Sequence, residues 1–417
     1  MDDPNLEKTI DAIRDRLANP DWQALLQASD KGRPRGNLFN VVIALRHCSE
    51  LKGRLRWNES RLQTDICRPL PWGSLTARPW TNVDDVRLTE WLQAHDIPVG
   101  LEVAQQAVDA VAAEDSYHPV RDWLTALAWD GTRRVEKWLP YYLGVEPSDY
   151  VEHIGRCWLV SAVARVMQPG CKADHVLVLE GPQGKGKSTA LRALAGHEWF
   201  TDEMADLGSK DAAMQTRGVW IVELSELDQL NRGEVSRIKA FITRTVDRFR
   251  PPYGRRVVEA PRECVFAGTV NNSEYLKDDT GNRRFWPVEI TSIDLDALKQ
   301  DREQIWAEAF ALWKGGQAWW IESPEVAAAA AEEQAKRQAH DPWHEKIEEH
   351  VRGNVTVSIR DILGTALDKR TGDWTRGDEM RVASCLRVIG FERRRVTVSK
   401  SGERAWKYVR AGAHLDV

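Results

Sequence analysis

Short apolar runs alternate with amphipathic segments through the middle of the chain. Four of these runs have the length and the β-branched or aromatic content of buried strands: HVLVLEG (175–181), VWIVEL (219–224), ECVFAGTV (263–270) and RFWPVEI (284–290). Segments with helical spacing of apolar residues lie between them. Strands that alternate with helices predict an α/β core with a largely parallel sheet.

The pattern differs on either side of this core, which predicts further domains. Residues 1–117 show mostly helical spacing between loops rich in Pro and Gly, so we expect a mainly helical N-terminal domain. The core occupies residues 118–325, and the alanine-rich residues 326–340 predict a helical connector. Residues 341–417 combine three helical patterns with two strand-like runs around a KSGE turn, which predicts a winged-helix-like domain.

Composition narrows the class of protein. The chain is 42% hydrophobic and 29% charged, and it has no N-terminal apolar segment that resembles a signal peptide. Its six cysteines form no CxxC pair, which argues against zinc and disulfides and fits a reducing compartment. The net charge of −5 gives no global signature of nucleic-acid binding, although the C-terminal end is locally basic. We expect a cytoplasmic protein with no membrane partner.

A glycine-rich stretch follows the first strand of the core and precedes a helical pattern. It contains the spacing G-x-x-x-x-G-K-S, whose glycines let backbone N–H groups converge on phosphate oxygens. Lys187 is placed to reach the β- and γ-phosphates, and Ser188 to offer its hydroxyl to Mg²⁺. The motif predicts a nucleoside triphosphate and Mg²⁺ as ligands, and with the features of the whole chain described below we take that nucleotide to be ATP. The residues expected around the phosphates are Gly181, Pro182, Gln183, Gly184, Lys185, Gly186, Lys187, Ser188 and Thr189.

Two glutamates mark the end of the second strand. Glu223 and Glu226 lie three residues apart in VELSEL. One carboxylate at such a position holds Mg²⁺, and a second polarises the attacking water. We expect Glu226, at the strand exit, to be the metal-facing acid, with Glu223 as the alternative. No N-K-x-D motif follows, which counts against a GTPase.

Polar residues also end the third strand and precede the fourth. Asn271 is placed to hydrogen-bond the γ-phosphate or the water, with a simple turn as the alternative. Arg283 and Arg284 lie on a turn before the fourth strand and could be plain surface charges. The order phosphate loop, acidic strand, Asn, arginine turn is the layout of an oligomeric motor whose arginine completes a neighbour's ATP site. We expect Arg284 to be that finger and Arg283 to face the interface or its own nucleotide.

With these residues in view, nearly the whole chain resembles the virulence-associated protein E family, a phage- and plasmid-borne group related to superfamily 3 helicases. The resemblance rests on segments such as HPVRDWLTALAWDGTRRVEKWLP, HVLVLEGPQGKGKSTALRAL and VNNSEYLKDDTGNRRFWPVEI. It implies an AAA+-like ATPase, a hexameric ring and action on DNA. It assigns the loop to Walker A, Asn271 to the sensor and the two arginines to the finger position. The sequence ELSEL has no adjacent carboxylates, so the assignment of the two glutamates stays open.

A basic segment follows the second strand. It surrounds a Pro-Pro-Tyr-Gly turn and suits a hairpin that tracks the phosphates of a single strand while an aromatic ring stacks on bases, although a solvated surface loop is the alternative. Lys239 resembles the basic residue that begins this element in superfamily 3 motors. The nucleic-acid contacts expected are Lys239, Arg250, Tyr253, Arg255 and Arg256, with Arg394 on the C-terminal wing.

These features favour an ATP-dependent DNA helicase or translocase that acts in replication of a phage or mobile element. The expected partners are single-stranded or forked DNA, further copies of the chain, and a primase or another replication protein. A switch or loader that binds DNA or a partner without unwinding is the alternative. A kinase would fit the phosphate loop but would leave the arginine turn and the hairpin unexplained.

Overall fold

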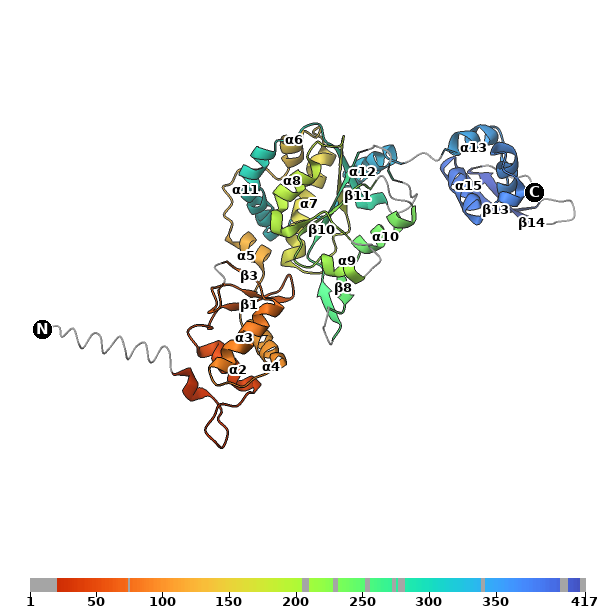
Figure 1. Cartoon of the computed structure of the whole chain (residues 1–417). Helices are drawn as coiled ribbons and strands as arrows, with labels where there is room; N and C mark the ends of the chain where they lie inside the picture. The colour runs from red at the N-terminus through yellow and green to blue at the C-terminus, as the bar shows by residue number, and fades with distance from the viewer. Residues whose placement is uncertain are drawn as a thin grey trace.

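The computed structural model describes residues 21–73, 76–204, 210–227, 232–251, 256–271, 275–276, 282–338, 342–397 and 404–412. Figure 1 shows an N-terminal region, a central region and a C-terminal region that follow one another along the molecule. Buried apolar residues form separate clusters in the N-terminal and C-terminal regions, and two main clusters in the central region, one of them the largest of these four. Within the described residues, no helix has the length and apolar content needed to cross a bilayer.

The N-terminal region pairs helices with a small sheet that the sequence pattern did not predict. The sheet has four strands in the order β3-β2-β1-β4. Its strands are two to four residues long, too short to show the alternation by which a strand is recognised. The elements are η1 (Trp22–Leu25), α2 (Leu38–His47), β1 (Leu55–Asn58), β2 (Gln63–Ile66), β3 (Arg78–Pro79), α3 (Asn82–Ala94), α4 (Leu101–Ala112) and β4 (Ser116–Tyr117).

The central region is built on a parallel sheet of five strands in the order β11-β5-β10-β7-β6. The predicted strands supply four of them: β5 (Val176–Glu180), β7 (Ile221–Leu224), β10 (Val265–Val270) and β11 (Phe285–Glu289). The short β6 (Phe200–Thr201) extends one edge. The prediction of an α/β protein with a parallel sheet is confirmed.

Both faces of this sheet are covered, which explains why its strands are almost continuously apolar. Along β5, Leu177 and Leu179 belong to one cluster, whereas Val176 and Val178 belong to the other. All five β5 residues are buried. The carboxyl ends of β5, β7 and β10 therefore meet at one edge of a rigid layer, where the loops that follow them are held close together.

Helices pack on both sides of the sheet (Figure 1). One face carries α5 (Pro119–Ala126), α6 (Trp138–Leu143), α7 (Asp149–Met167), α8 (Lys187–Ala195), α11 (Leu295–Lys314) and α12 (Pro324–Lys336). The other face carries α9 (Lys210–Gln215) and α10 (Arg232–Ile242). The short helical turns are η2 (His197–Trp199) and η3 (Asn282–Arg284). An antiparallel hairpin of β8 (Val246–Phe249) and β9 (Val258–Pro261) projects from this body.

The C-terminal region combines short helices with a three-stranded sheet in the order β12-β14-β13. The predicted KSGE turn lies outside the described residues. The elements are α13 (His344–Val351), β12 (Thr356–Val357), α14 (Ile359–Asp361), the π-helix η4 (Ile362–Ala366), η5 (Thr371–Asp373), α15 (Arg376–Val388), β13 (Phe391–Thr397) and β14 (Arg404–Arg410).

Candidate functional site

A glycine-rich loop connects β5 to α8 at the carboxyl edge of the sheet. Gly184 and Gly186 have φ values of 83° and 86°, in the left-handed region that only glycine adopts without strain. Gly181 donates its backbone N–H to the carbonyl oxygen of Val270 at 3.3 Å, which ties the start of the loop to β10. Helix α8 begins at Lys187 with no side-chain cap, so its first N–H groups face the loop. This is the geometry that binds an anion at a helix N-terminus.

Lys187 folds back into this loop. Its Nζ donates to the carbonyl oxygens of Gly181 and Pro182 at 2.5 and 3.0 Å, and to Oδ1 of Asn271 at 3.2 Å. Only 7% of the residue is exposed. The ammonium group therefore sits between the loop and the end of β10. Lys185, in contrast, is exposed and donates to the carbonyl oxygen of Thr291 at 3.2 Å.

Glu223 is the acidic residue that faces the loop. It lies within β7 and pairs with Ala267 of β10, and it is 1% exposed. Its Oε1 accepts hydrogen bonds from the hydroxyl groups of Ser188 at 2.7 Å and Thr269 at 2.6 Å. Its buried Oε2 has no hydrogen-bond partner among the described residues. An unsatisfied carboxylate oxygen beside a serine hydroxyl is an oxygen-rich set that fits Mg²⁺.

Glu226 lies in a different environment. It follows the end of β7, has an exposed side chain, and holds a φ of 54°, a left-handed conformation that is uncommon outside glycine. The sequence favours Glu226 as the metal-facing acid, but the structure brings Glu223 to Ser188. Glu226 instead lies at the rim of the same cavity. The two carboxylates are thus separated into a buried one and an exposed one.

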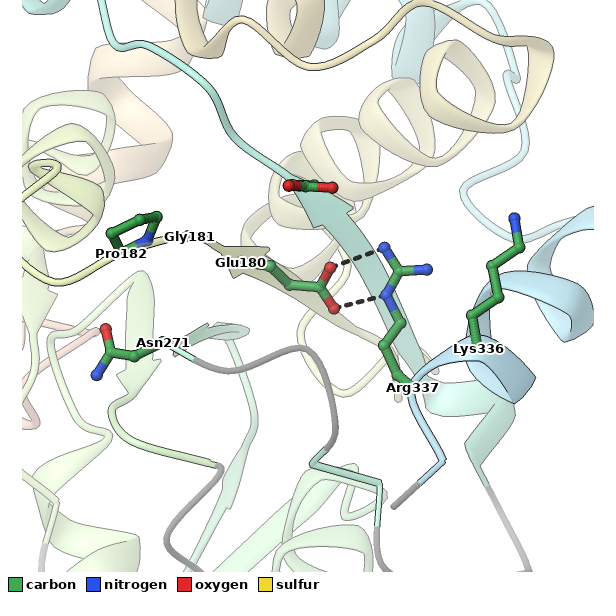
Figure 2. Close-up of a pocket in the computed structure, with 7 residues that line it drawn as sticks. Glu180, Gly181, Pro182, Asn271, Lys336 and Arg337 are labelled. Atoms are coloured by element: carbon green, nitrogen blue, oxygen red, sulfur yellow. Dashed lines mark hydrogen bonds and ion pairs between the residues drawn. The ribbon is translucent and has the colours of Figure 1, made fainter. Parts of the chain in front are cut away.

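One cavity collects most of the predicted phosphate-site residues. It has a volume of about 430 Å³ and is lined by Gln183, Gly184, Lys185, Gly186, Lys187, Ser188, Thr189, Glu223, Ser225, Glu226, Thr269 and Asn271. Gly181 and Pro182 line a neighbouring cavity that shares Asn271 (Figure 2). The sequence analysis assigned no role to Ser225 or Thr269. A hydroxyl near the end of an otherwise apolar strand was the available signal for Thr269.

The arginine turn is directed into its own chain. Arg284 donates from Nε to Oγ1 of Thr243 at 3.2 Å and lies 3.6 Å from the carboxylate of Asp174. Arg283 is exposed. The described lining of the phosphate cavity includes neither arginine. The structure therefore leaves the arginines outside the phosphate site of the chain that carries them.

The predicted nucleic-acid residues fall into two groups. Arg250, Arg256 and Arg394 are exposed, and Arg394 is paired with Glu392 at 2.7 Å. Lys239 is 7% exposed, donates to Oδ1 of Asn282 at 3.1 Å, and thereby joins α10 to the arginine turn instead of facing solvent. Tyr253 and Arg255 lie outside the described residues.

The basic hairpin also contains a buried arginine. Arg262 follows β9, is 1% exposed, and forms an ion pair with Asp247 of β8 at 2.5 Å. Its guanidinium lies 4.3 Å from the ring centroid of Phe241. This arginine holds the base of the hairpin together and is not available to a ligand.

A family model described as a virulence-associated protein E-like domain matches residues 124–339, more than half of the chain. The chain belongs to the virulence-associated protein E-like family. The match spans the phosphate loop, both glutamates, Asn271 and the arginine turn, so the family resemblance noted from the sequence is confirmed. Among curated proteins, no relative matches.

Two solved structures are similar to this family member. The apo structure of the NrS-1 C terminal region (305-718) has a TM-score of 0.49 and 13% identity, over 86% of this chain and 96% of that one. The A form apo structure of the NrS-1 C terminal region has a TM-score of 0.46 and 12% identity, over the same 86% and 96%. With TM-scores below 0.5, these likenesses carry no argument about this chain.

Proposed function

We propose that the chain is a Mg²⁺-dependent ATP hydrolase that moves along or unwinds DNA during replication of a phage or mobile element. The observation that carries this proposal is the convergence of Lys187 and Asn271 on one side of the loop, and of Ser188 and Glu223 on the other. An ammonium group and an amide joined by a hydrogen bond suit the binding of a nucleotide's γ-phosphate. A hydroxyl that donates a hydrogen bond to a buried carboxylate suits the binding of the magnesium ion that accompanies the nucleotide.

In this proposal the loop is a Walker A P-loop within an AAA+-like core. Mg²⁺–ATP supplies the phosphoanhydride bond and a divalent charge at the phosphates. Lys187 exchanges its carbonyl partners for phosphate oxygens, and Ser188 and Glu223 hold the metal. Glu226 orients the attacking water from the cavity rim, and Asn271 donates to the γ-phosphate. Each of these groups acts by position and charge, which is how phosphoryl-transfer enzymes obtain most of their rate.

The position of the arginine turn is the basis for proposing that several copies of the chain assemble. Arg284 is the candidate finger, but it contacts Thr243 and Asp174 of its own chain. An arginine that stabilises the transition state has to come from outside the phosphate cavity, and a neighbouring copy can supply it. We therefore propose a ring, hexameric as the family resemblance implies, with ATP sites between subunits.

The basic hairpin is the proposed DNA contact of this ring. Arg250 and Arg256 flank the tip of the β8–β9 hairpin, and exposed guanidinium groups on a projecting hairpin suit a phosphate backbone. The C-terminal region, with its three-stranded sheet and Arg394 on β13, is proposed to be winged-helix-like and to contact DNA or a replication partner such as a primase.

Two cations near the hairpin, Lys239 and Arg262, are buried, and this favours a second candidate function. Because Lys239 and Arg262 are turned inward, the described hairpin offers fewer positive groups to DNA than its sequence suggests. A switch or loader that uses ATP for assembly, without unwinding, needs fewer such contacts.

A pair of assays separates the two functions. The motor requires Mg²⁺-dependent ATP turnover that rises with single-stranded DNA, together with displacement of a strand from a forked substrate. ATP turnover that is insensitive to DNA, with no strand displacement, would favour the loader. A wild-type chain with no ATP turnover at all would rule out both.

A further inference from the structure

A second cavity lies beside the phosphate loop, and a buried ion pair forms part of its wall. The cavity has a volume of about 480 Å³ and contacts Gly181, Pro182 and Asn271 on the loop side (Figure 2). Glu180, the last residue of β5, accepts from Nε and Nη2 of Arg337 at 2.7 Å each. Glu180 is 4% exposed, and it directly precedes the first glycine of the loop.

Arg337 also holds the segment that follows Asn271. Its carbonyl oxygen accepts from the backbone N–H groups of Tyr275 at 3.2 Å and Leu276 at 3.0 Å. Its side chain and its backbone therefore hold two different strand exits. One leads into the phosphate loop, and the other belongs to the segment that follows β10 and Asn271.

Arg337 lies at the end of a helix that the sequence predicts to be a connector. Arg337 is the C-terminal cap of α12, and Gln334 of the same helix donates to the carbonyl oxygen of Phe285 at 2.9 Å. Glu333, one turn earlier, pairs with the opposite side of the same guanidinium. The end of α12 is thus attached to β5, to β11 and to the segment after β10.

Burying such a pair is not an efficient source of stability, because both ions lose water. A bidentate Arg–carboxylate pair does fix geometry well, since two parallel hydrogen bonds define both distance and direction. The position of this pair, at the root of the loop whose carbonyl oxygens hold Lys187, points to geometry as its use.

We propose that Arg337 is a positioning residue for the phosphate site, acting through Glu180 and through the 275–276 backbone. This inference rests on the proposed ATPase function and deepens it. By holding both strand exits, Arg337 sets the distance between the loop and Asn271. It also ties that distance to the end of α12, the helix that carries Arg337 as its C-terminal cap.

The test compares Glu180→Gln, Arg337→Gln and the double variant in steady-state ATP hydrolysis. Each single variant is expected to lower kcat about tenfold with KM little changed, because misplaced groups reduce stabilisation of the transition state more than binding. The double variant is expected to lose about tenfold as well, not a hundredfold, because both changes break one interaction. Arg337→Lys, which keeps the charge but not the fork, is expected to recover part of the loss.

Glu333→Gln is the matched control. It removes the other carboxylate partner of Arg337 and leaves Glu180 in place, so its kcat is expected to stay within about twofold of wild type. If a single variant fails to fold, the double variant, which buries no unpaired charge, is compared with Glu333→Gln in its place. The proposal would be overturned if kcat were unchanged in Glu180→Gln and in the double variant. It would also be overturned if the loss of kcat in the double variant equalled the product of the losses in the two single variants. A wild-type chain with no turnover would instead contradict the proposed function.

Discussion

The phosphate loop and the arginine turn both lie in the central region. They differ in whether their polar side chains already have hydrogen-bond or ion-pair partners in the same chain. At the loop, Ser188 and Thr269 share one oxygen of Glu223, and the other oxygen has no partner among the described residues. The loop cavity is lined mostly by polar residues. The unsatisfied oxygen of Glu223 leaves a place for a metal ion.

At the arginine turn, charged groups are directed toward neighbours in the same chain. Arg284 contacts Thr243 and Asp174, and Lys239 contacts Asn282. The difference fits the proposed function, in which a single chain offers the groups expected to bind ATP and Arg284 contacts its own chain outside the phosphate cavity. Under the proposed function, ATP binding would be a property of one chain, whereas fast hydrolysis would require a second.

The largest expected effect comes from removing the loop cation. Lys187→Ala is expected to lower kcat/KM for ATP about a thousandfold, because no other described ammonium contacts both the loop and Asn271. Lys185→Ala is the matched control and is expected to lose only a few-fold, since Lys185 is exposed. Steady-state hydrolysis of Mg²⁺–ATP measures both. Equal losses in the two variants would break the assignment of Lys187.

The next effect separates the two glutamates. Glu223→Gln is expected to lower turnover about a hundredfold and to raise the Mg²⁺ concentration needed for half-maximal rate, because a metal ligand is lost. Glu226→Gln is expected to lower kcat with an unchanged Mg²⁺ requirement, because it orients water only. Magnesium titrations of ATP hydrolysis distinguish the two. If Glu226→Gln alone raised the Mg²⁺ concentration needed for half-maximal rate, Glu226 would be the metal-facing acid, as predicted from the sequence.

Much of the phosphate region could be predicted because its signals are local. The four long strands, the loop glycines, Lys187 and Ser188 all belong to short continuous patterns. The preference for Glu226 over Glu223 had no firm basis in the sequence, because it depends on which residue is in register with Ala267 across the sheet. The Glu180–Arg337 pair joins residues far apart in the chain, and no local pattern marks it.

The arginine region was harder to predict for the same physical reason. A lysine or arginine near a turn is solvated in most proteins, so the burial of Lys239 and Arg262 has no signature in composition or spacing. Their partners, Asn282 and Asp247, become neighbours only after the helix and the hairpin have packed.

A smaller effect tests which hairpin arginines meet DNA. Arg256→Ala is expected to weaken binding to single-stranded DNA about tenfold at low salt and to reduce the slope of affinity against salt by about one ion. Arg262→Ala is expected to lower the free energy of unfolding by about 3–5 kcal/mol, because it leaves Asp247 buried without a partner. Fluorescence anisotropy and denaturant unfolding measure the two. A loss of stability without a loss of DNA affinity in Arg256→Ala, or the opposite result in Arg262→Ala, would contradict the placement of these residues.

The smallest expected effect concerns the link between the arginine turn and the hairpin. Thr243 accepts from Arg284 and lies between α10 and β8, so Thr243→Val is expected to reduce the stimulation of ATP hydrolysis by DNA about fivefold, because one hydrogen bond from the guanidinium is lost. Thr243→Ser keeps the hydroxyl and is expected to match wild type. Stimulation that is unchanged in Thr243→Val would show that the hairpin and the turn act independently.

The most direct test of the central claim mixes two inactive chains. Lys187→Ala cannot bind ATP productively but retains Arg284, whereas Arg284→Ala retains the phosphate loop but lacks the finger. If the site of one chain is completed by the arginine of the next, an equimolar mixture is expected to hydrolyse ATP faster than either variant alone. A mixture no more active than its two components, in protein that assembles as wild type does, would contradict the claim.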